Sequence, residues 1–177
     1  MAMGQHCPVL QIIGYKNSGK TTFMEKLIKK SSCLGLQAAS VKHHGHGGEP
    51  AKERADKDSC RHQEAGAFLS SVEGSGMLQL QASKTRWDLE EIIELYHHFH
   101  PDIIFVEGYK NAAYPKIVLL RNQEDELLLD QCTNVICAIS HYKNTDEKRR
   151  LPVRHFFMQD DAEYIDYIFQ KVRRQDE

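Results

Sequence analysis

The segment Gly14-Tyr15-Lys16-Asn17-Ser18-Gly19-Lys20-Thr21 decides the fold, because it matches the phosphate-loop pattern GxxxxGK[ST] at every fixed position. It follows the short apolar run of residues 9–13 and precedes a segment in which apolar residues recur at helical spacing. A phosphate loop needs this order of strand, loop and helix, since the first turn of the helix offers N–H groups and a positive dipole to phosphates. The segment therefore predicts a nucleotide-binding α/β fold; a glycine-rich turn without a ligand is the alternative.

The fixed positions of the loop predict contacts with a nucleoside triphosphate. The glycines let the backbone curl so that successive N–H groups point at one oxyanion. Lys20 is expected to reach the β and γ phosphates, and the hydroxyl of Thr21 to bind Mg²⁺. The nucleotide-binding residues predicted in the loop are Gly14, Asn17, Ser18, Gly19, Lys20, Thr21 and Thr22.

The rest of the chain alternates predicted strands and helices, which is typical of a mostly parallel sheet with helices on both faces. Strands are expected at residues 9–13, 38–42, 103–106, 116–121, 135–139 and 153–157. Residues 68–72 and 77–81 flank the turn at 74–76 and predict a hairpin excursion outside this alternation. We therefore expect an α/β, phosphate-loop NTPase-like fold in a single domain, residues 1–177, with a frayed tail at about 173–177.

Two helices are marked by capping patterns. Asp88 with Glu91 forms a capping box before a helix that Pro101 stops, and Asp160 with Glu163 forms another near the end of the chain. The spacing places two sets of apolar residues on inward faces: Leu89, Ile92, Ile93, Tyr96 and Phe99 in the first helix, and Ile165, Ile168, Phe169 and Val172 in the second.

Composition excludes several classes of protein. The 177 residues carry 23 Lys and Arg against 25 Asp and Glu, a balance that argues against binding nucleic acid by bulk positive charge. Apolar runs such as residues 103–106 are too short to cross a membrane, and residues 1–8 lack the features of a signal peptide. The five cysteines form no CxxC pair, so neither a disulfide framework nor a thiolate zinc site is indicated. We expect a cytoplasmic protein with neither a nucleic-acid nor a membrane partner.

A carboxylate is expected to complete the magnesium site. Asp102 begins the apolar strand at 103–106, and Glu107-Gly108 follows its end. The ends of parallel strands lie on the ligand side of a sheet, so Glu107 rather than Asp102 is predicted to approach Mg²⁺. Gly108 would then let the backbone lie near the γ-phosphate. A structural acid at the strand end is the alternative for Glu107.

The segment after the second predicted strand is rich in histidine. His43, His44 and His46 could bind Ni²⁺ or Zn²⁺, contact a substrate or phosphate, or belong to a solvated loop. Asp58, Arg61 and His62 follow, and from the residues alone they are equally consistent with the charged start of a helix. Base recognition is poorly marked, because residues 144–147 lack the lysine and the aspartate position of an NKxD guanine motif.

Several blocks together resemble the molybdopterin-guanine dinucleotide biosynthesis protein B (MobB) family. The blocks are Leu10-Gln11-Ile12-Ile13 with the phosphate loop, Val41-Lys42-His43-His44-Gly45-His46, Lys57-Asp58-Ser59 with Arg61-His62, Val106-Glu107-Gly108-Tyr109-Lys110, and Pro115-Lys116-Ile117 with Arg121. The phosphate loop is common to many families, whereas the other blocks in this order are much more particular. The resemblance covers residues 9–121, with a looser match in the final third.

The resemblance implies a GTP-binding accessory protein that uses Mg²⁺, hydrolyses GTP weakly at most, and works with a MobA-type guanylyltransferase that attaches GMP to molybdopterin. It also implies that a partner or pterin loop faces the γ-phosphate or the pterin partner; its predicted residues are His43, His44, His46, Asp58, Arg61, His62 and Lys110. A nickel metallochaperone GTPase and a small-molecule kinase are the alternatives.

A homodimer is also expected, because two apolar segments fall outside the regular alternation of strands and helices. These segments are residues 77–81 and residues 127–129, and either is predicted to help build the dimer interface.

Overall fold

The computed structural model describes residues 7–44, 57–142 and 151–173. It divides into two compact units, one formed by the chain up to residue 45 and from residue 89 onward, the other by residues 46–88. The described part of the second unit is a helix with a two-stranded antiparallel hairpin. The single domain expected from the sequence stays a prediction.

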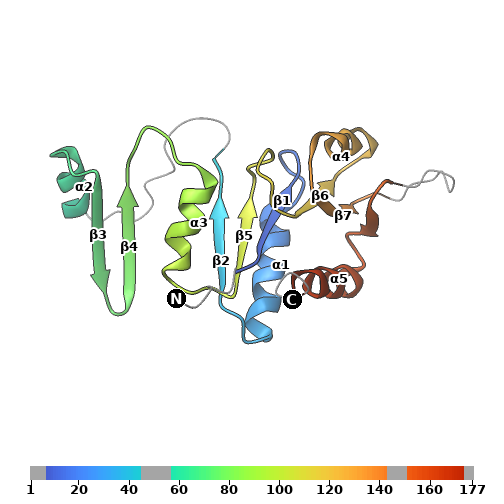
Figure 1. The fold of residues 1–177 in the computed structure, drawn as a ribbon, viewed down its shortest axis with the longest axis horizontal. Coiled ribbons are helices and arrows are strands. Elements are labelled where there is room, and N and C mark those ends of the chain that lie inside the picture. The colour runs from blue at the N-terminus through green and yellow to red at the C-terminus, as the bar shows by residue number, and fades with distance from the viewer. Residues whose placement is uncertain (1–6, 45–56, 143–150, 174–177) are drawn as a thin grey trace, which may run out of the picture. The chain divides into compact units, whose positions relative to one another are not determined.

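The first unit is built on a parallel sheet of six strands in the order β2-β5-β1-β6-β7-β8 (Figure 1). All five strand pairs are parallel, as the alternation of strands and helices predicted. The strands are β1 (Val9–Ile13), β2 (Ala38–Lys42), β5 (Ile103–Glu107), β6 (Lys116–Leu120), β7 (Val135–Ser140) and β8 (Arg154–Phe157). Strands β1, β5 and β6 are buried along their whole length, which explains why they are mostly apolar, with Gln11 the one polar residue inside β1.

Helices cover both faces of the sheet, also as predicted. Helices α1 (Lys20–Cys33) and α5 (Asp161–Arg173) pack on one face, where Phe23, Leu27 and Ile168 meet alternate residues of the four central strands. Helices α3 (Leu89–His97) and α4 (Leu127–Gln131) pack on the other face. Among the described residues, no helix combines the length and apolar character needed to cross a membrane.

Two details of the predicted helix faces are wrong. Helix α3 ends at His97, so Phe99 lies beyond the helix, where its N–H bonds the carbonyl of Tyr96 in a turn. Its side chain is 61% exposed and does not lie on the inward face of the helix. In α5 the sequence pattern missed Tyr164, which is fully buried against Phe23. The hydroxyl of Tyr164 is not left without a hydrogen-bond partner in the core, because it donates to Asp161.

The segment at residues 127–129 is not a free apolar strip. It begins α4, which follows the short 3-10 helix η1 (Gln123–Glu126). Leu128 and Leu129 are buried against β6 and β7, whereas Leu127 is 61% exposed. The prediction that this segment helps to form a dimer interface is therefore wrong for two of its three leucines, since both already pack inside the chain.

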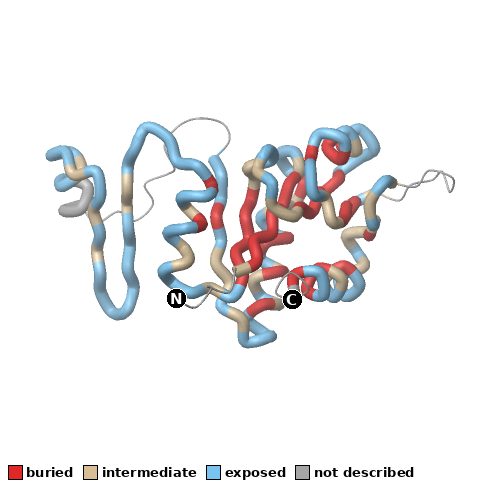
Figure 2. The backbone as a smooth tube through the Cα atoms, in the orientation of Figure 1, coloured by how far each residue is buried: buried red, intermediate tan, exposed pale blue. Residues whose placement is uncertain are grey.

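The second unit contains α2 (Lys57–Glu64) and the antiparallel hairpin of β3 (Leu69–Gly74) and β4 (Met77–Ala82). The predicted hairpin is confirmed, with Gly74 paired to Met77 across the turn. Figure 2 shows the contrast between the units: the central strands of the first are mostly red, and the hairpin is mostly pale blue. The exposed side chains of the hairpin include three leucines, Leu69, Leu78 and Leu80, each between 45% and 49% exposed.

The burial difference within α4 predicts a difference in stability. Replacing Leu128 by alanine should lower the free energy of unfolding by about 2–5 kcal/mol, because it removes buried methyl groups and leaves a cavity. Leu127→Ala is the matched control in the same helix and should change it by about 0.5 kcal/mol or less. Urea unfolding of both variants measures the difference, and equal losses would contradict the packing described for α4.

Candidate nucleotide-binding site

The loop between β1 and α1 has the tight backbone that the phosphate-loop pattern requires. Asn17 and Gly19 both have positive φ, 62° and 83°. A side chain at Gly14 would place its Cβ 2.4 Å from the hydroxyl of Ser18, so only glycine fits there. The loop is thus folded as a compact cradle before the first turn of α1. Thr22 follows in that turn and is exposed.

The side chain of Lys20 lies back across this loop. Its Nζ donates to the carbonyls of Gly14 (2.9 Å) and Tyr15 (2.8 Å), which fixes the ammonium above the cradle. Burial lowers the pKa of Lys20, Glu107 opposes that effect, and Lys42 adds to it. A phosphate bound here would favour the charged form of this lysine, because an anion offsets the loss of hydration.

Glu107 reaches the same place from the end of β5. Its Oε2 accepts a long hydrogen bond of 3.5 Å from the hydroxyl of Thr21 and lies 3.9 Å from Nζ of Lys42. The register explains the meeting, since Glu107 pairs with Ile12 at the end of β1 and with Lys42 at the end of β2. A hydroxyl and a carboxylate oxygen this close form a donor set that Mg²⁺ prefers, so the residues fit the predicted metal.

Asp102 has a structural role instead. Its Oδ2 accepts a 2.6 Å hydrogen bond from the N–H of Gln37, at the opposite end of β5 from Glu107. The choice of Glu107 over Asp102 as the carboxylate near the loop, made from the direction of parallel strands, therefore agrees with the geometry.

Gly108 turns the chain sharply after Glu107. It has a φ of 97°, Tyr109 has a φ of 54°, and a Cβ at Gly108 would lie 3.0 Å from the Cβ of His43. The amide of the fully buried Gln11 donates to the carbonyls of both residues, at 2.9 Å and 2.8 Å. These bonds hold the strained turn in place beside Glu107.

Arg121 is a residue near the loop that was not among the predicted site residues. It follows β6, donates from Nη1 to the carbonyl of Lys16 (3.1 Å), and stacks over the ring of Tyr15 at 5.4 Å. Asp125 fixes it with two bonds of 2.8 Å. This hydrogen bonding raises the pKa of Arg121 and lowers the pKa of Asp125.

His141 is the second residue that was missed. It follows β7, and its Nε2 donates to the carbonyl of Ser18 over 3.1 Å. Lys42, Arg121 and His141 are not part of the phosphate-loop pattern, but each stands at or directly after the carboxyl end of a parallel strand. The rule that selected Glu107 would have found all three.

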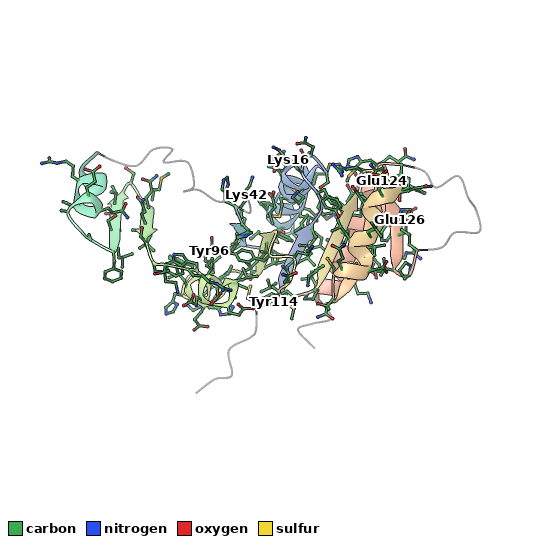
Figure 3. All side chains as sticks on the ribbon, turned by 90° about the horizontal axis from the view of Figure 1, so that it is seen from above. Lys16, Lys42, Tyr96, Tyr114, Glu124 and Glu126 are labelled. Atoms are coloured by element: carbon green, nitrogen blue, oxygen red, sulfur yellow. The ribbon has the colours of Figure 1, made fainter. Side chains whose placement is uncertain are left out.

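Figure 3, which looks onto the carboxyl ends of the strands, shows Lys16 between Lys42 and Glu124. The described contacts gather Gly14, Ser18, Lys20, Thr21, Glu107 and Gly108 into one site. The ammonium groups of Lys20 and Lys42 and the carboxylate of Glu107 thus lie together at the carboxyl ends of the strands.

The predicted partner or pterin loop is only partly described. The N–H of His43 donates to the carbonyl of Glu107, and its ring lies 4.3 Å from that of Tyr109; His44 is exposed. His46 lies outside the described residues, as do the side chains of residues 57–60, including Asp58. In the part of the chain that the structure describes, no three His, Cys, Asp or Glu side chains group as metal ligands.

The remaining members of that predicted set lie elsewhere. Arg61 and His62 are exposed residues of α2 and belong to the second unit. Lys110 donates from Nζ to Oε1 of Gln131 at 3.1 Å, at the end of α4. This contact directs Lys110 toward α4.

Comparison with known proteins points to one family. The model of "MobB: Molybdopterin guanine dinucleotide synthesis protein B" matches residues 9–141. A probable molybdopterin-guanine dinucleotide biosynthesis adapter protein of Bacillus subtilis (strain 168) is 41% identical over 174 residues, 98% of each chain. A molybdopterin-guanine dinucleotide biosynthesis adapter protein of Haemophilus influenzae is 31% identical and matches 79% of this chain and 78% of its own length.

Comparison with solved structures points to the same family. The crystal structure of Bacillus subtilis MobB has a TM-score of 0.77 and 40% identity, covering 92% of this chain and 96% of that one. A MobB protein homolog from Bacillus stearothermophilus has a TM-score of 0.75 and 34% identity, covering 94% and 98%. These matches support neither the nickel metallochaperone nor the small-molecule kinase. The chain therefore belongs to the MobB family of molybdopterin-guanine dinucleotide biosynthesis adapter proteins.

Proposed function

We propose that this adapter protein binds GTP with Mg²⁺ at the phosphate loop and assists a MobA-type guanylyltransferase in attaching GMP to molybdopterin. The observation that carries the proposal is the approach of Thr21 Oγ1 to Glu107 Oε2, 3.5 Å apart, beside the ammonium of Lys20. A cation and two oxygen ligands for a metal meet there at the start of a helix, as triphosphate binding requires.

Each residue of the site has a role in this proposal. The loop amides around Asn17 and Gly19 hold phosphate oxygens, and Lys20 neutralises charge on the β and γ phosphates. Thr21 and Glu107 hold Mg²⁺, which would bridge the phosphates and draw charge from them. Gly108 lets the backbone after Glu107 turn sharply and lie near the γ-phosphate.

Binding and handover are the main task in this proposal, and GTP hydrolysis is secondary. The carboxylate of Glu107 faces Thr21 and Lys42 and is assigned to the metal, so it is poorly placed to activate a water. His43 and His44 follow β2 on the same edge of the sheet, and we assign them to the pterin or partner side. His46, Asp58, Arg61, His62 and Lys110 complete this assignment as predictions.

The proposal includes a homodimer formed through the hairpin. Strand pairing puts Leu78 opposite Glu73, Leu80 opposite Ser71 and Leu69 opposite Ala82. The three leucines therefore share one side of the hairpin, which we call the leucine face, and all three are exposed. Exposed apolar side chains gathered on one side are typical of an interaction surface.

The first test removes the cation of the loop. Lys20→Ala should weaken GTP binding by at least about 30-fold, because a half-buried charge that pairs with phosphate is lost without a change in the core. The variant should also lose the ability to stimulate molybdopterin guanylylation by a MobA-type enzyme. Titration calorimetry and a reconstituted guanylylation assay measure the two effects.

Lys16→Ala is the matched control, since Lys16 is an exposed lysine in the same loop. We expect its GTP affinity to remain within about threefold of that of the unmodified protein. A folded Lys20→Ala variant that binds GTP as tightly as the control does would contradict the assignment of the phosphate loop.

The second test concerns the metal. Glu107→Gln should weaken GTP binding about 10- to 100-fold with Mg²⁺ present and have little effect in EDTA, because Glu107 acts through the ion. Asp102→Asn, at the other end of the same strand, should leave binding unchanged in both buffers. Equal losses in the two buffers would make Glu107 a structural residue.

The third test concerns the leucine face. The unmodified protein should be a dimer in light scattering at about 10 μM, and Leu80→Glu should make it a monomer by placing a charge in an apolar contact. Gln79→Glu adds the same charge on the opposite side of the hairpin and should leave the dimer intact. A monomeric unmodified protein would refute the dimer, and dissociation by both variants would refute the leucine face.

A further inference from the structure

A cavity lies at the ends of β6 and β7. It is an open surface hollow lined by the exposed Asn122, Gln123 and Glu124 and the half-buried Tyr142, and its volume is about 360 Å³. That volume falls at the lower end of the range of about 300–1,000 Å³ found for small-molecule sites. The roles assigned above to the phosphate loop do not use these residues.

The cavity adjoins the phosphate loop on two sides. Arg121, which directly precedes Asn122, donates to the carbonyl of Lys16 over 3.1 Å. His141, which directly precedes Tyr142, donates to the carbonyl of Ser18 over 3.1 Å. Both walls of the cavity are thus tied to the backbone that curls around the phosphates.

The strand order indicates in which direction a nucleotide bound at the phosphate loop would extend. Strands β5 and β6 flank β1 on opposite sides, and the metal-site carboxylate Glu107 ends β5. If the γ-phosphate lies on the β5 side of the loop, the rest of a nucleoside triphosphate would extend over the ends of β6 and β7. The cavity lies in that direction, and Figure 3 shows Glu124 on the far side of Lys16 from Lys42.

We propose that this cavity receives the nucleobase and that Glu124 and Asn122 select guanine. The inference rests on the proposed function, since it takes GTP binding at the phosphate loop as given. A carboxylate accepts hydrogen bonds but donates none, so Glu124 suits the N1–H and the 2-amino group of guanine and repels the N1 lone pair of adenine. Oδ1 of Asn122 already accepts from the N–H of Asp125 (3.2 Å), which leaves its NH₂ group to donate to guanine O6.

The ring of Tyr142 is fixed as a stacking surface. Its hydroxyl donates to Oε1 of Glu126 over 2.6 Å. The hydroxyl of Ser140 donates to the carbonyl of Tyr142 and accepts from Nε2 of His155, both at 2.8 Å. An aromatic side chain held at both ends offers a base a face that needs no reordering on binding.

The decisive experiment measures base preference. Dissociation constants of GTP, ITP, XTP, ATP and inorganic tripolyphosphate are measured by calorimetry with Mg²⁺ for the unmodified protein, Glu124→Gln and Tyr142→Leu. Glu163→Gln, an exposed glutamate on α5 of the same unit, is the control and should behave as the unmodified protein does.

The unmodified protein should prefer GTP to the other three nucleotides. Glu124→Gln should weaken the binding of GTP about 10- to 100-fold, which is the effect of losing one charged hydrogen bond. The same variant should strengthen the binding of XTP, because an amide can donate to the 2-oxo group of xanthine. Tyr142→Leu should weaken the binding of all four nucleotides by similar factors. Tripolyphosphate binding should not change in either variant, since it reports on the phosphate loop alone.

Two results would overturn the inference. If Glu124→Gln keeps the ratio of GTP to XTP affinity of the unmodified protein, the base lies elsewhere, and tight GTP binding would leave the proposed function standing. If the unmodified protein binds neither GTP nor tripolyphosphate, the proposed function fails and the base site fails with it.

Discussion

The parallel pairing of β1 with β5 on one side and β6 on the other is the constraint on which the site depends. Register places Ile12 beside Glu107 and Ile13 beside Val118, so the loop after β1 emerges between the ends of two buried strands. A shift of one residue would turn Glu107 to the opposite face of the sheet, away from Thr21. Buried apolar side chains on both faces make such a shift costly, and the core thereby fixes the distance between the loop and its carboxylate.

Two polar residues inside this largely apolar sheet stabilise the segment that links β5 to β6. Gln11 lies on β1 and holds the carbonyls of Gly108 and Tyr109. Lys116 is fully buried on β6, and its ammonium donates to the carbonyls of Ala112 and Tyr114. Burial lowers the pKa of Lys116, a cost that the fold bears to order the segment that enters β6.

Much of this arrangement could be predicted from the sequence, because the phosphate loop and the apolar strands are local patterns. Glu107 could be chosen because strand direction is known once the sheet is parallel. The contacts of Arg121 and His141 with the loop could not be read from the phosphate-loop pattern, since each residue bonds a backbone carbonyl distant in the chain. Leu128 was misjudged because three adjacent leucines show no periodicity, and only the packing of α4 separates the exposed one from the buried pair.

The position of Lys20 also bears on the entropy of ligand binding. An ammonium has three N–H donors, and two of them are engaged by the carbonyls of Gly14 and Tyr15. The third can meet a phosphate without the side chain leaving its place. A free lysine side chain carries about 2 kcal/mol of rotamer entropy, and here most of that loss occurs during folding. Association with an anion would then require little further ordering of this side chain, which favours a higher affinity for the anion.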